Sequence, residues 1–226
     1  MQSVSIRKVE SLRIYLGLGS NLGDREANLR EAIERIKKLG LVVTRESSIY
    51  ETEPVGHKDQ PWFLNQVIEA IITPESFANF GDELMALAAR AAFEDGQTTM
   101  AYMTASQPFF NALLRIEDEM GRERPFPNSP RTIDIDLLLY GDLYFFTATT
   151  CAEKDSQGNE TGISRAKVQP DSLVVPHPRM HLRRFVLEPL CEIAPDVIHP
   201  TLGKTCRQLL AELNDPSIVR KLPRNT

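Results

Sequence analysis

The sequence has little of what marks secreted, membrane or nucleic-acid-binding proteins. Its three cysteines, Cys151, Cys191 and Cys206, are odd in number and widely separated, which gives neither a disulfide framework nor a zinc pattern and is typical of a reducing cytoplasm. No stretch approaches the ~18 apolar residues of a membrane span, and the first residues lack the apolar core of a secretory signal. A net charge of −5 offers no general basic surface, so we expect neither a membrane nor a nucleic acid as a partner.

The composition is that of a globular protein with a real core. With 226 residues, of which 42% are hydrophobic and 25% charged, the chain suits one domain with additions. We expect this domain at residues 13–213, with terminal tails at 1–12 and 214–226. Two stretches, about 80–107 and 144–169, are expected to be insertions that either cover a site or contact another subunit.

Hydrophobic periodicity predicts the order strand, helix, strand, strand, helix, strand, followed by further elements. The predicted elements are a strand and turn at 13–24, a helix at 29–39, strands at 41–50 and 62–73, helical segments at 81–92 and 109–120 with a loop at 95–107 between them, strands at 131–140 and 173–177, and helices from 182 and at 206–213. Because no helix separates 41–50 from 62–73, these two strands are expected to pair antiparallel. The expected fold class is α+β, a ferredoxin-like βαββαβ two-layer sandwich with extra C-terminal elements and two insertions.

The most informative stretch is the predicted strand at 131–140. Alternation places Ile133 and Ile135 on one face, and Asp134 and Asp136 on the other. Two carboxylates about 7 Å apart on one face repel each other. They become favourable where a hard cation such as Mg²⁺ lies over them and substrate phosphates complete its coordination. A D-x-D pattern alone is more often a solvated strand face, but here the strand is otherwise apolar and follows a basic residue.

Basic side chains flank this strand in the sequence. They are Arg122, Arg124 and Arg131 before it, and His177, Arg183 and Arg184 after it. Guanidinium groups bind phosphate oxygens in a forked geometry, so arginines around a two-carboxylate site suggest a polyphosphate substrate. Each arginine taken alone is more often a surface side chain. The four histidines show no zinc spacing, and no Ser-His-Asp order or reactive cysteine indicates covalent catalysis.

A glycine-rich pattern, from Gly17 to Gly23, ends the first predicted strand. Its position before a helix hints at phosphate binding, but it matches neither the G-x-G-x-x-G fingerprint nor a P-loop. A close-packed turn from strand to helix is the favoured interpretation.

Several motifs together resemble the 6-hydroxymethyl-7,8-dihydropterin pyrophosphokinase family. They are Gly17–Gly23, Tyr50–Pro54, Gln60–Asn65, Glu117–Arg122, Pro130–Asp136, and Val175–His177 with Arg183 and Phe185. They occur in the family's order between about Ile14 and about Pro200, and the P-R-x-x-D-x-D element is specific to the family. The resemblance implies a folate-pathway enzyme that transfers the β,γ-diphosphate of ATP to the hydroxymethyl group of the pterin and releases AMP.

The resemblance also implies cofactors and site residues. Asp134 and Asp136 match aspartates that hold two Mg²⁺ ions, and with Arg122 and Arg131 they form the expected catalytic set. The residues expected on the side of ATP, the co-substrate, are Glu117 as a carboxylate, Leu137, Leu173 and Val174 along adenine, and Arg124, His177 and Arg183 at the phosphates. The residues expected on the pterin side are Phe63 and Phe185 on the two ring faces, Asn65 at the hydrogen-bonding edge, and Thr52, Pro54 and Val55 through their backbone.

Three positions depart from the family pattern. Phe63 stands where a tyrosine is frequent, which removes a hydroxyl but keeps the stacking face. Asn128 replaces a tryptophan in the loop before the D-x-D strand, and Ser172 replaces an arginine expected to contact ATP.

Two other function classes fit the residues alone. One is a binding module that holds a nucleotide without turning it over, and the other is a simple phosphohydrolase. Both would lack a reaction that depends on the pterin. The expected partners are the two small-molecule substrates, and the sequence leaves a monomer and a homodimer equally open.

Overall fold

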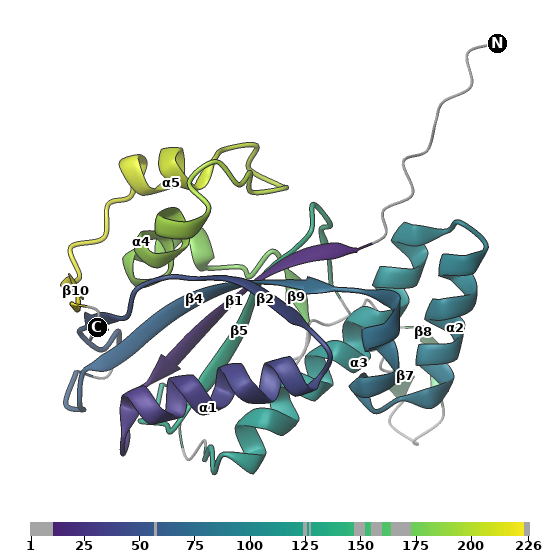
Figure 1. Ribbon diagram of the computed structural model, residues 1–226, viewed down its shortest axis with the longest axis horizontal. Helices are drawn as coiled ribbons and strands as arrows, with labels where there is room; N and C mark the ends of the chain where they lie inside the picture. The colour runs from purple at the N-terminus through teal and green to yellow at the C-terminus, as the bar shows by residue number, and fades with distance from the viewer. Residues whose placement is uncertain are drawn as a thin grey trace.

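The computed structural model describes residues 11–56, 58–123, 126, 128–146, 152–154, 160–163 and 173–223. These residues form a mixed fold in which helices cover both faces of an antiparallel sheet (Figure 1). The strands are β1 (Leu12–Ser20), β2 (Val42–Glu46), β3 (Tyr50–Thr52), β4 (Phe63–Ile72), β5 (Asp134–Tyr140), β6 (Phe145–Phe146), β7 (Ala152–Lys154), β8 (Glu160–Ile163), β9 (Val174–Val175) and β10 (Val219–Lys221). The α-helices are α1 (Arg25–Lys38), α2 (Glu83–Glu94), α3 (Thr98–Glu119), α4 (Arg184–Ile193) and α5 (Cys206–Glu212), and the 3₁₀-helices are η1 (Pro74–Phe80) and η2 (Met180–Leu182).

The large sheet has the strand order β10-β3-β4-β1-β5, and β2 also pairs with β4. All of these pairings are antiparallel, so the pairing predicted between 41–50 and 62–73 is confirmed. The stretch 41–50 is two strands, however, and the prediction of one continuous strand is wrong. The chain breaks at Ser47, whose hydroxyl accepts a hydrogen bond from the backbone N–H of Val67 in place of a ladder bond.

A hydrophobic core lies on each face of the sheet. Alternation along β1 directs Ile14 and Leu16 into a core with α1 and α3, and directs Tyr15 into a core with α4 and α5. The helices of the two cores lie on opposite sides of the sheet in Figure 1. The molecule therefore has three layers, helix–sheet–helix. The prediction was two layers with extra C-terminal elements. The difference arises because α4 and α5 form a layer of their own.

The first predicted helix is confirmed as α1. The Asp24 carboxylate caps it by accepting a hydrogen bond of 3.0 Å from the N–H of Ala27. Leu29, Ile33 and Ile36 recur at helical spacing and are buried. Gly40 follows with φ of +82°, the left-handed conformation that ends many helices.

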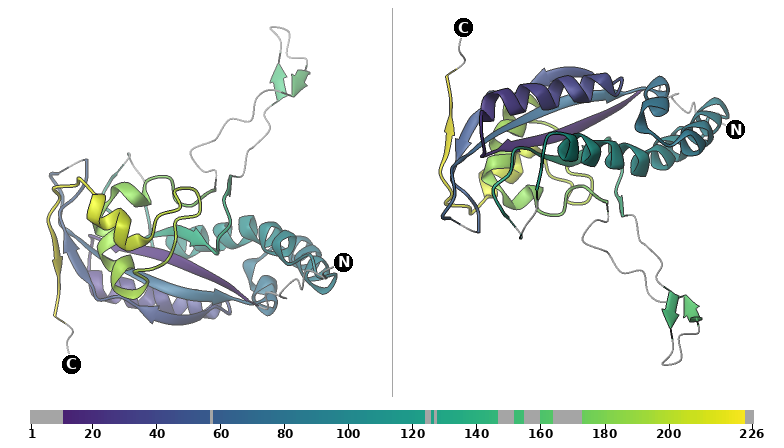
Figure 2. Two further views of the ribbon diagram at one scale, coloured as in Figure 1. Left: turned by 90° about the horizontal axis from the view of Figure 1, so that it is seen from above. Right: turned by 90° about the horizontal axis from the view of Figure 1, so that it is seen from below.

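The loop predicted at 95–107 is wrong for most of its length. Only 95–97 separate α2 from α3, and α3 is helical from Thr98 onwards. Tyr102, Ala105 and Phe109 recur every three or four residues and are buried, so packing outweighs the weak helix propensity of the threonines and serines between them. The insertion expected at about 80–107 thus forms a helical extension at the end of the molecule opposite β10 (Figures 1 and 2).

The C-terminal tail predicted at 214–226 is not loose where the structure describes it. β10 adds to the edge of the large sheet beside β3, with Val219 opposite Thr52 and Lys221 opposite Tyr50 (Figure 2). At the other end of the chain, β1 already begins at Leu12 within the predicted tail 1–12. Residues 1–10 and most of the insertion expected at 144–169 lie outside the described residues; within that insertion β7 pairs with β8.

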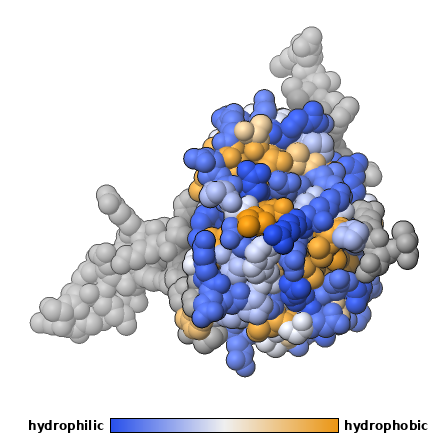
Figure 3. All heavy atoms as spheres, turned by 90° about the vertical axis from the view of Figure 1, so that its left-hand side faces the viewer, coloured by the Kyte–Doolittle hydropathy of each residue, from blue (hydrophilic) through white to orange (hydrophobic). Residues whose placement is uncertain are grey.

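Two further features are the apolarity of the helices and the hydropathy of the surface. Within the part of the chain that the structure describes, no helix combines the length and apolarity that a bilayer crossing requires. Figure 3 shows the end of the molecule that carries β10, where patches of hydrophobic side chains stand among hydrophilic ones. Such a mixture is ordinary for a protein surface.

Candidate functional site

Strand β5 presents both aspartates to the same side, as the alternation predicted. Ile135 and Leu137 are buried on the opposite side, while Asp134 and Asp136 line a cavity of about 370 Å³. On the neighbouring strand β1, Gly19 lies opposite Asp134 and Gly17 opposite Asp136. The two pairs of residues together form one wall of the cavity.

A side chain at position 19 would displace the Asn65 amide from the cavity wall. A Cβ atom on Gly19 would lie 2.9 Å from Asn65 Oδ1, closer than real Cβ contacts occur. Asn21, in the same glycine-rich segment, accepts a 2.8 Å hydrogen bond from the N–H of Arg131 and donates to Gln60 and Pro61 at 3.0 Å. These contacts support the close-packed interpretation of the segment, since its small and polar residues join two loops at the cavity.

Asp134 is held tightly by two arginines. Arg122 and Arg131 each place a guanidinium nitrogen 2.6 Å from one of its carboxylate oxygens. Behind Asp134, Arg122 also pairs with Glu117, which is buried and accepts a 2.6 Å hydrogen bond from the N–H of Ile135. Burial raises the pKa of Glu117, while the Arg122 charge opposes that rise. Glu117 and Arg122 therefore fix Asp134 from within the protein.

Asp136 has no comparably close cation among the described contacts. Arg183 lies 3.8 Å from its carboxylate and His177 lies 3.9 Å away. Burial in the cavity wall, together with the nearby charge of Asp134, raises the pKa of Asp136 to about 7 against the pull of Arg183. This carboxylate is thus costly to ionise in the absence of a ligand, which is the behaviour expected of a cation-binding group.

His177 is neutral in this environment. Burial, reinforced by the charges of Arg183 and Arg179, lowers its pKa to about 4. The backbone N–H of Arg179 donates to His177 Nδ1 at 3.2 Å, so the ring proton belongs on Nε2, the nitrogen that faces Asp136. His177 can therefore donate a hydrogen bond to an acceptor beside Asp136.

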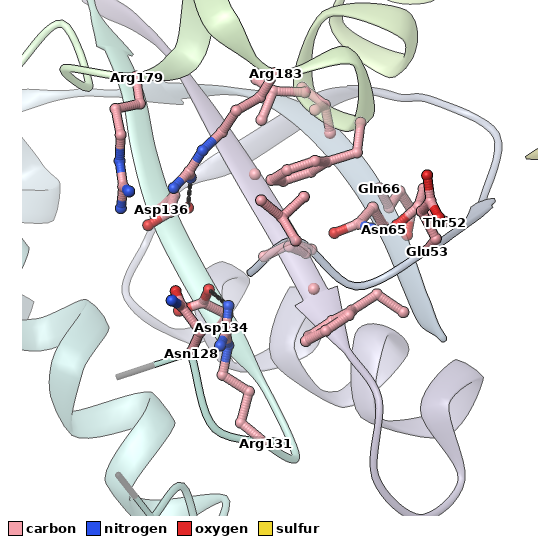
Figure 4. Close-up of a pocket in the computed structure, with 18 of the residues that line it drawn as sticks. Thr52, Glu53, Asn65, Gln66, Asn128, Arg131, Asp134, Asp136, Arg179 and Arg183 are labelled. Carbon is pink, nitrogen blue, oxygen red and sulfur yellow. Dashed lines mark hydrogen bonds and ion pairs between the residues drawn. The ribbon is translucent and has the colours of Figure 1, made fainter. Parts of the chain in front are cut away.

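The wall opposite the aspartates is aromatic and amidic. Phe63 and Phe185 both line the cavity, and each carries an arginine over its ring, Arg131 at 5.0 Å and Arg183 at 5.4 Å from the ring centre. Asn65 donates a 2.7 Å hydrogen bond to Thr52 Oγ1, which fixes its amide in the wall. Figure 4 shows the separation, with Asp134 and Asp136 on one side, and Asn65 and Thr52 on the other.

The structure brings most of the predicted site residues together. Those that line the cavity are Thr52, Val55, Phe63, Asn65, Arg131, Asp134, Asp136, Arg183 and Phe185. Glu117 and Arg122 lie behind Asp134 and contribute through it. Asn128, the position of a family tryptophan, also lines the cavity, whereas Arg124 and Ser172 lie outside the described residues.

The residues expected along adenine lie elsewhere. The side chains of Leu137 and Leu173 are in the hydrophobic core with α1 and α3. Val174 and His177 line a separate cavity of about 300 Å³. Pro54 is buried and is not part of the cavity lining, and Arg184 turns away from it toward Glu188 and Asp215.

Sequence reasoning missed several cavity residues. They are Gly17, Gly19, Glu53, Gln60, Gln66, Arg179 and Leu182. Arg179 had a detectable signal, since it lies between His177 and Arg183 in the same basic segment. Gln66 had no such signal, because strand alternation predicts that its side chain lies on the face of β4 opposite to that of its neighbour Asn65.

The donors at β5 fit a hard divalent cation. Among the described residues there is no cluster of three or more histidine, cysteine, aspartate or glutamate side chains that could enclose a metal. Two carboxylates facing an open cavity suit Mg²⁺ instead, since this ion is commonly bound by one or two carboxylates plus water and substrate phosphates. The raised pKa of Asp136 agrees, because a cation would supply the charge that its surroundings lack.

Comparisons with known proteins point to one family. The family model described as 7,8-dihydro-6-hydroxymethylpterin-pyrophosphokinase (HPPK) matches residues 15–92 and 85–195. A Bacillus subtilis 2-amino-4-hydroxy-6-hydroxymethyldihydropteridine pyrophosphokinase is 35% identical over 81% of this chain and 78% of its own length. A protein of the same name from Methylorubrum extorquens is 33% identical over 93% of this chain and 98% of its own length.

Longer proteins contain a similar region. The folic acid synthesis protein fol1 of Pneumocystis carinii is 29% identical over 97% of this chain, which spans only 22% of that protein. A crystal structure of an HPPK-DHPS protein in complex with substrates shares the fold, with a TM-score of 0.53 at 14% identity, over 89% of this chain and 43% of that one. Since the family model covers most of the sequence and two relatives exceed 30% identity over most of both chains, this chain belongs to the 7,8-dihydro-6-hydroxymethylpterin pyrophosphokinase family.

Proposed function

We propose that this chain transfers the diphosphate of ATP to the hydroxymethyl group of 6-hydroxymethyl-7,8-dihydropterin and releases AMP, as a step in folate synthesis. The observation that carries the proposal is a single cavity in which the two aspartates of the family motif face an aromatic and amidic wall. The names of the bacterial relatives support it, because both are pyrophosphokinases of this pterin.

The pterin binds between Phe63 and Phe185. A flat heterocycle gains most from aromatic faces on both sides and from an amide that reads its hydrogen-bonding edge. Both rings line the cavity, and the Asn65 amide, fixed by Thr52, lies in the same wall. Val55 and Glu53, on either side of Pro54, line the same cavity.

The phosphates of ATP bind near the aspartates. Arg131 and Arg183 face the cavity and provide forked donors for phosphate oxygens, and neutral His177 adds a donor at Nε2. Arg179, which also lines the cavity, adds positive charge to the same side. The pterin hydroxyl is a neutral nucleophile, so the residues promote reaction mainly by holding it in line with the β-phosphorus.

Asp134 and Asp136 hold two Mg²⁺ ions together with the phosphates. When bound, the ions polarise the phosphates and neutralise charge that develops on the leaving group. The chain's own contribution is to keep two carboxylates on one strand face, with Asp134 oriented by Arg122 and Asp136 exposed to the cavity.

The ferredoxin-like interpretation of the fold belongs to this proposal. The central order β2/β3–β4–β1–β5, with every pairing antiparallel and with α1 and α3 on one face, supports it. Strands β1 to β5 and β10 belong to one continuous sheet, which supports a single catalytic domain over the predicted range 13–213, extended to β10.

The test measures AMP and inorganic phosphate released from MgATP with and without the reduced pterin alcohol. We expect AMP in the presence of the pterin and neither product in its absence. Phosphate release without the pterin would identify a phosphohydrolase instead. ATP binding without turnover in either condition would identify a nucleotide-binding module.

A further inference from the structure

The proposed pterin site has two walls that come from distant parts of the chain. One wall is the end of β3, where Thr52 and Glu53 line the cavity. The other is the start of α4, where Arg183 and Phe185 line it. A short C-terminal segment, residues 215–219, contacts both walls, and we call it the C-terminal strap.

At one end of the strap, Asp215 caps helix α4. The N-cap residue Arg183 provides no side-chain cap of its own. Instead the first helical N–H, that of Arg184, donates to Asp215 Oδ2 at 2.8 Å, and Arg184 Nε donates to the backbone carbonyl of Asp215 at 2.9 Å. A carboxylate at this position satisfies an otherwise unpaired amide at the positive end of the helix.

The charge state of Asp215 agrees with the capping role. Burial opposes its ionisation, but hydrogen bonds from the backbone amides of Arg184 and Ser217 hold its pKa below the usual range for aspartate. Ser217 donates to Asp215 Oδ1 at 3.0 Å, so one carboxylate orients both the helix and the strap itself. Asp215 is therefore ionised and engaged at neutral pH.

At the other end, the strap holds the β3 wall. The N–H of Ile218 donates to Glu53 Oε1 at 2.9 Å, and the N–H of Glu53 donates to the carbonyl of Ile218 at 3.2 Å. The next residue, Val219, pairs with Thr52 in the sheet. Thr52 in turn accepts the hydrogen bond that fixes Asn65.

We infer that the C-terminal strap, anchored by Asp215, sets the spacing of the two walls and so positions the groups that bind the pterin. The inference rests on the proposed function. Asp215 bonds to Arg184, and neither residue is among those that line the cavity, so Asp215 is a positioning residue and not a catalytic one. Of the groups proposed to bind the phosphates, only Arg183 lies in the α4 wall, whereas Arg131, Asp134 and Asp136 share no described hydrogen bond with the strap. The effect of the strap is therefore expected to be larger on pterin binding than on ATP binding.

The experiment compares kinetic constants of the Asp215→Ala variant with those of the unaltered chain in the AMP-release assay. Loss of the cap lets the start of α4 move relative to β3, so we expect the KM for the pterin to rise about tenfold while the KM for MgATP changes less than about threefold. Asp215→Asn keeps one acceptor for the Arg184 amide and should recover part of the pterin KM. The matched control is Asp196→Ala, which removes an acid whose ion pair with Arg207 is exposed.

A second variant changes the length of the strap without removing the Asp215 side chain. Two glycines inserted between Pro216 and Ser217 lengthen the strap but leave its side chains intact, and the same selective rise in pterin KM is expected. An equal rise of both KM values, or a fall in kcat alone, would show that the strap merely stabilises the fold and would overturn the inference.

Failure of the proposed function is distinguishable from failure of the strap. If the unaltered chain releases no AMP with the pterin, the function is wrong, and hydrogen exchange then tests the strap directly. Asp215→Ala should speed exchange of amides in 50–53 and 184–187, with little change in β5. Unchanged exchange in both segments would overturn the inference as well.

Discussion

The two aspartates of β5 are two residues apart, yet their surroundings are built differently. Asp134 is gripped by Arg122 and Arg131 at 2.6 Å and backed by the buried Glu117. Asp136 has its nearest cation, Arg183, at 3.8 Å, the neutral His177 at 3.9 Å, and a pKa raised to about 7. The difference shows that Asp134 is integrated into the fold, while Asp136 keeps a charge that the protein alone does not compensate. Mutation and pH should therefore affect the two positions in opposite ways.

The largest effect is expected for Asp136→Ala. Removing this carboxylate takes away a ligand to the proposed Mg²⁺ ions, and kcat for AMP release should fall by about a thousandfold. Asp142→Ala, in the exposed turn after β5, is the matched control and should keep nearly full activity. An Asp136→Ala variant with full activity would refute the metal assignment.

Arg122→Ala tests the Asp134 side. The substitution leaves the buried Glu117 without its arginine and removes one of the two ion pairs of Asp134, so the free energy of unfolding should fall by roughly 3 kcal/mol in urea titrations. Arg183→Ala, on the Asp136 side, should change it by less than about 1 kcal/mol because its contact is longer and more open. Similar losses of unfolding free energy in the two variants would contradict the proposed difference between Asp134 and Asp136.

Phe185→Ala separates the pterin wall from the phosphate side. Loss of one stacking face should weaken pterin binding by about thirtyfold and ATP binding by less than about threefold. Isothermal titration with each ligand measures both. Equal weakening of the two would contradict the sandwich of Phe63 and Phe185.

Asp136→Asn tests the raised pKa by its effect on stability without ligand. Because the folded state raises the pKa of Asp136 to about 7, it binds more protons than the unfolded chain between about pH 4 and 7, and ionisation costs stability above that window. The variant should therefore be more stable than the unaltered chain by about 1 kcal/mol at pH 8, a discounted value because about a third of the side chain is accessible to water. The gain should vanish near pH 4.

The same substitution at Asp134 should change the stability in the opposite direction. Asp134→Asn breaks two short ion pairs, so it should lower stability at pH 8. Stabilisation by both substitutions would mean that Asp134, too, is uncompensated in the absence of ligand.

Local sequence patterns predicted the strands around the cavity better than they predicted the first half of α3 and the edge strand β10. The D-x-D strand, the antiparallel pairing of 41–50 with 62–73 and the capped helix α1 depend on alternation, helical spacing and caps, which neighbouring residues determine. The first half of α3 was missed because it follows Gly96 and contains several threonines and serines, and only burial of Tyr102 and Ala105 explains the helix. Strand β10 was missed because its three residues, of which only Val219 is apolar, carry almost no hydrophobic signal.

The sequence by itself determined the family, the two carboxylates on one strand face and the aromatic and amide residues expected to face them, because these follow from motif identity and strand alternation. Only the tertiary structure decided that Arg122 and Glu117 lie behind Asp134, and that the nearest described cation to Asp136 is Arg183 at 3.8 Å. It also decided that Asp215 caps α4 while Ile218 holds Glu53. Such contacts join residues far apart along the chain. Their partners are selected by packing of the whole fold, which no local periodicity encodes.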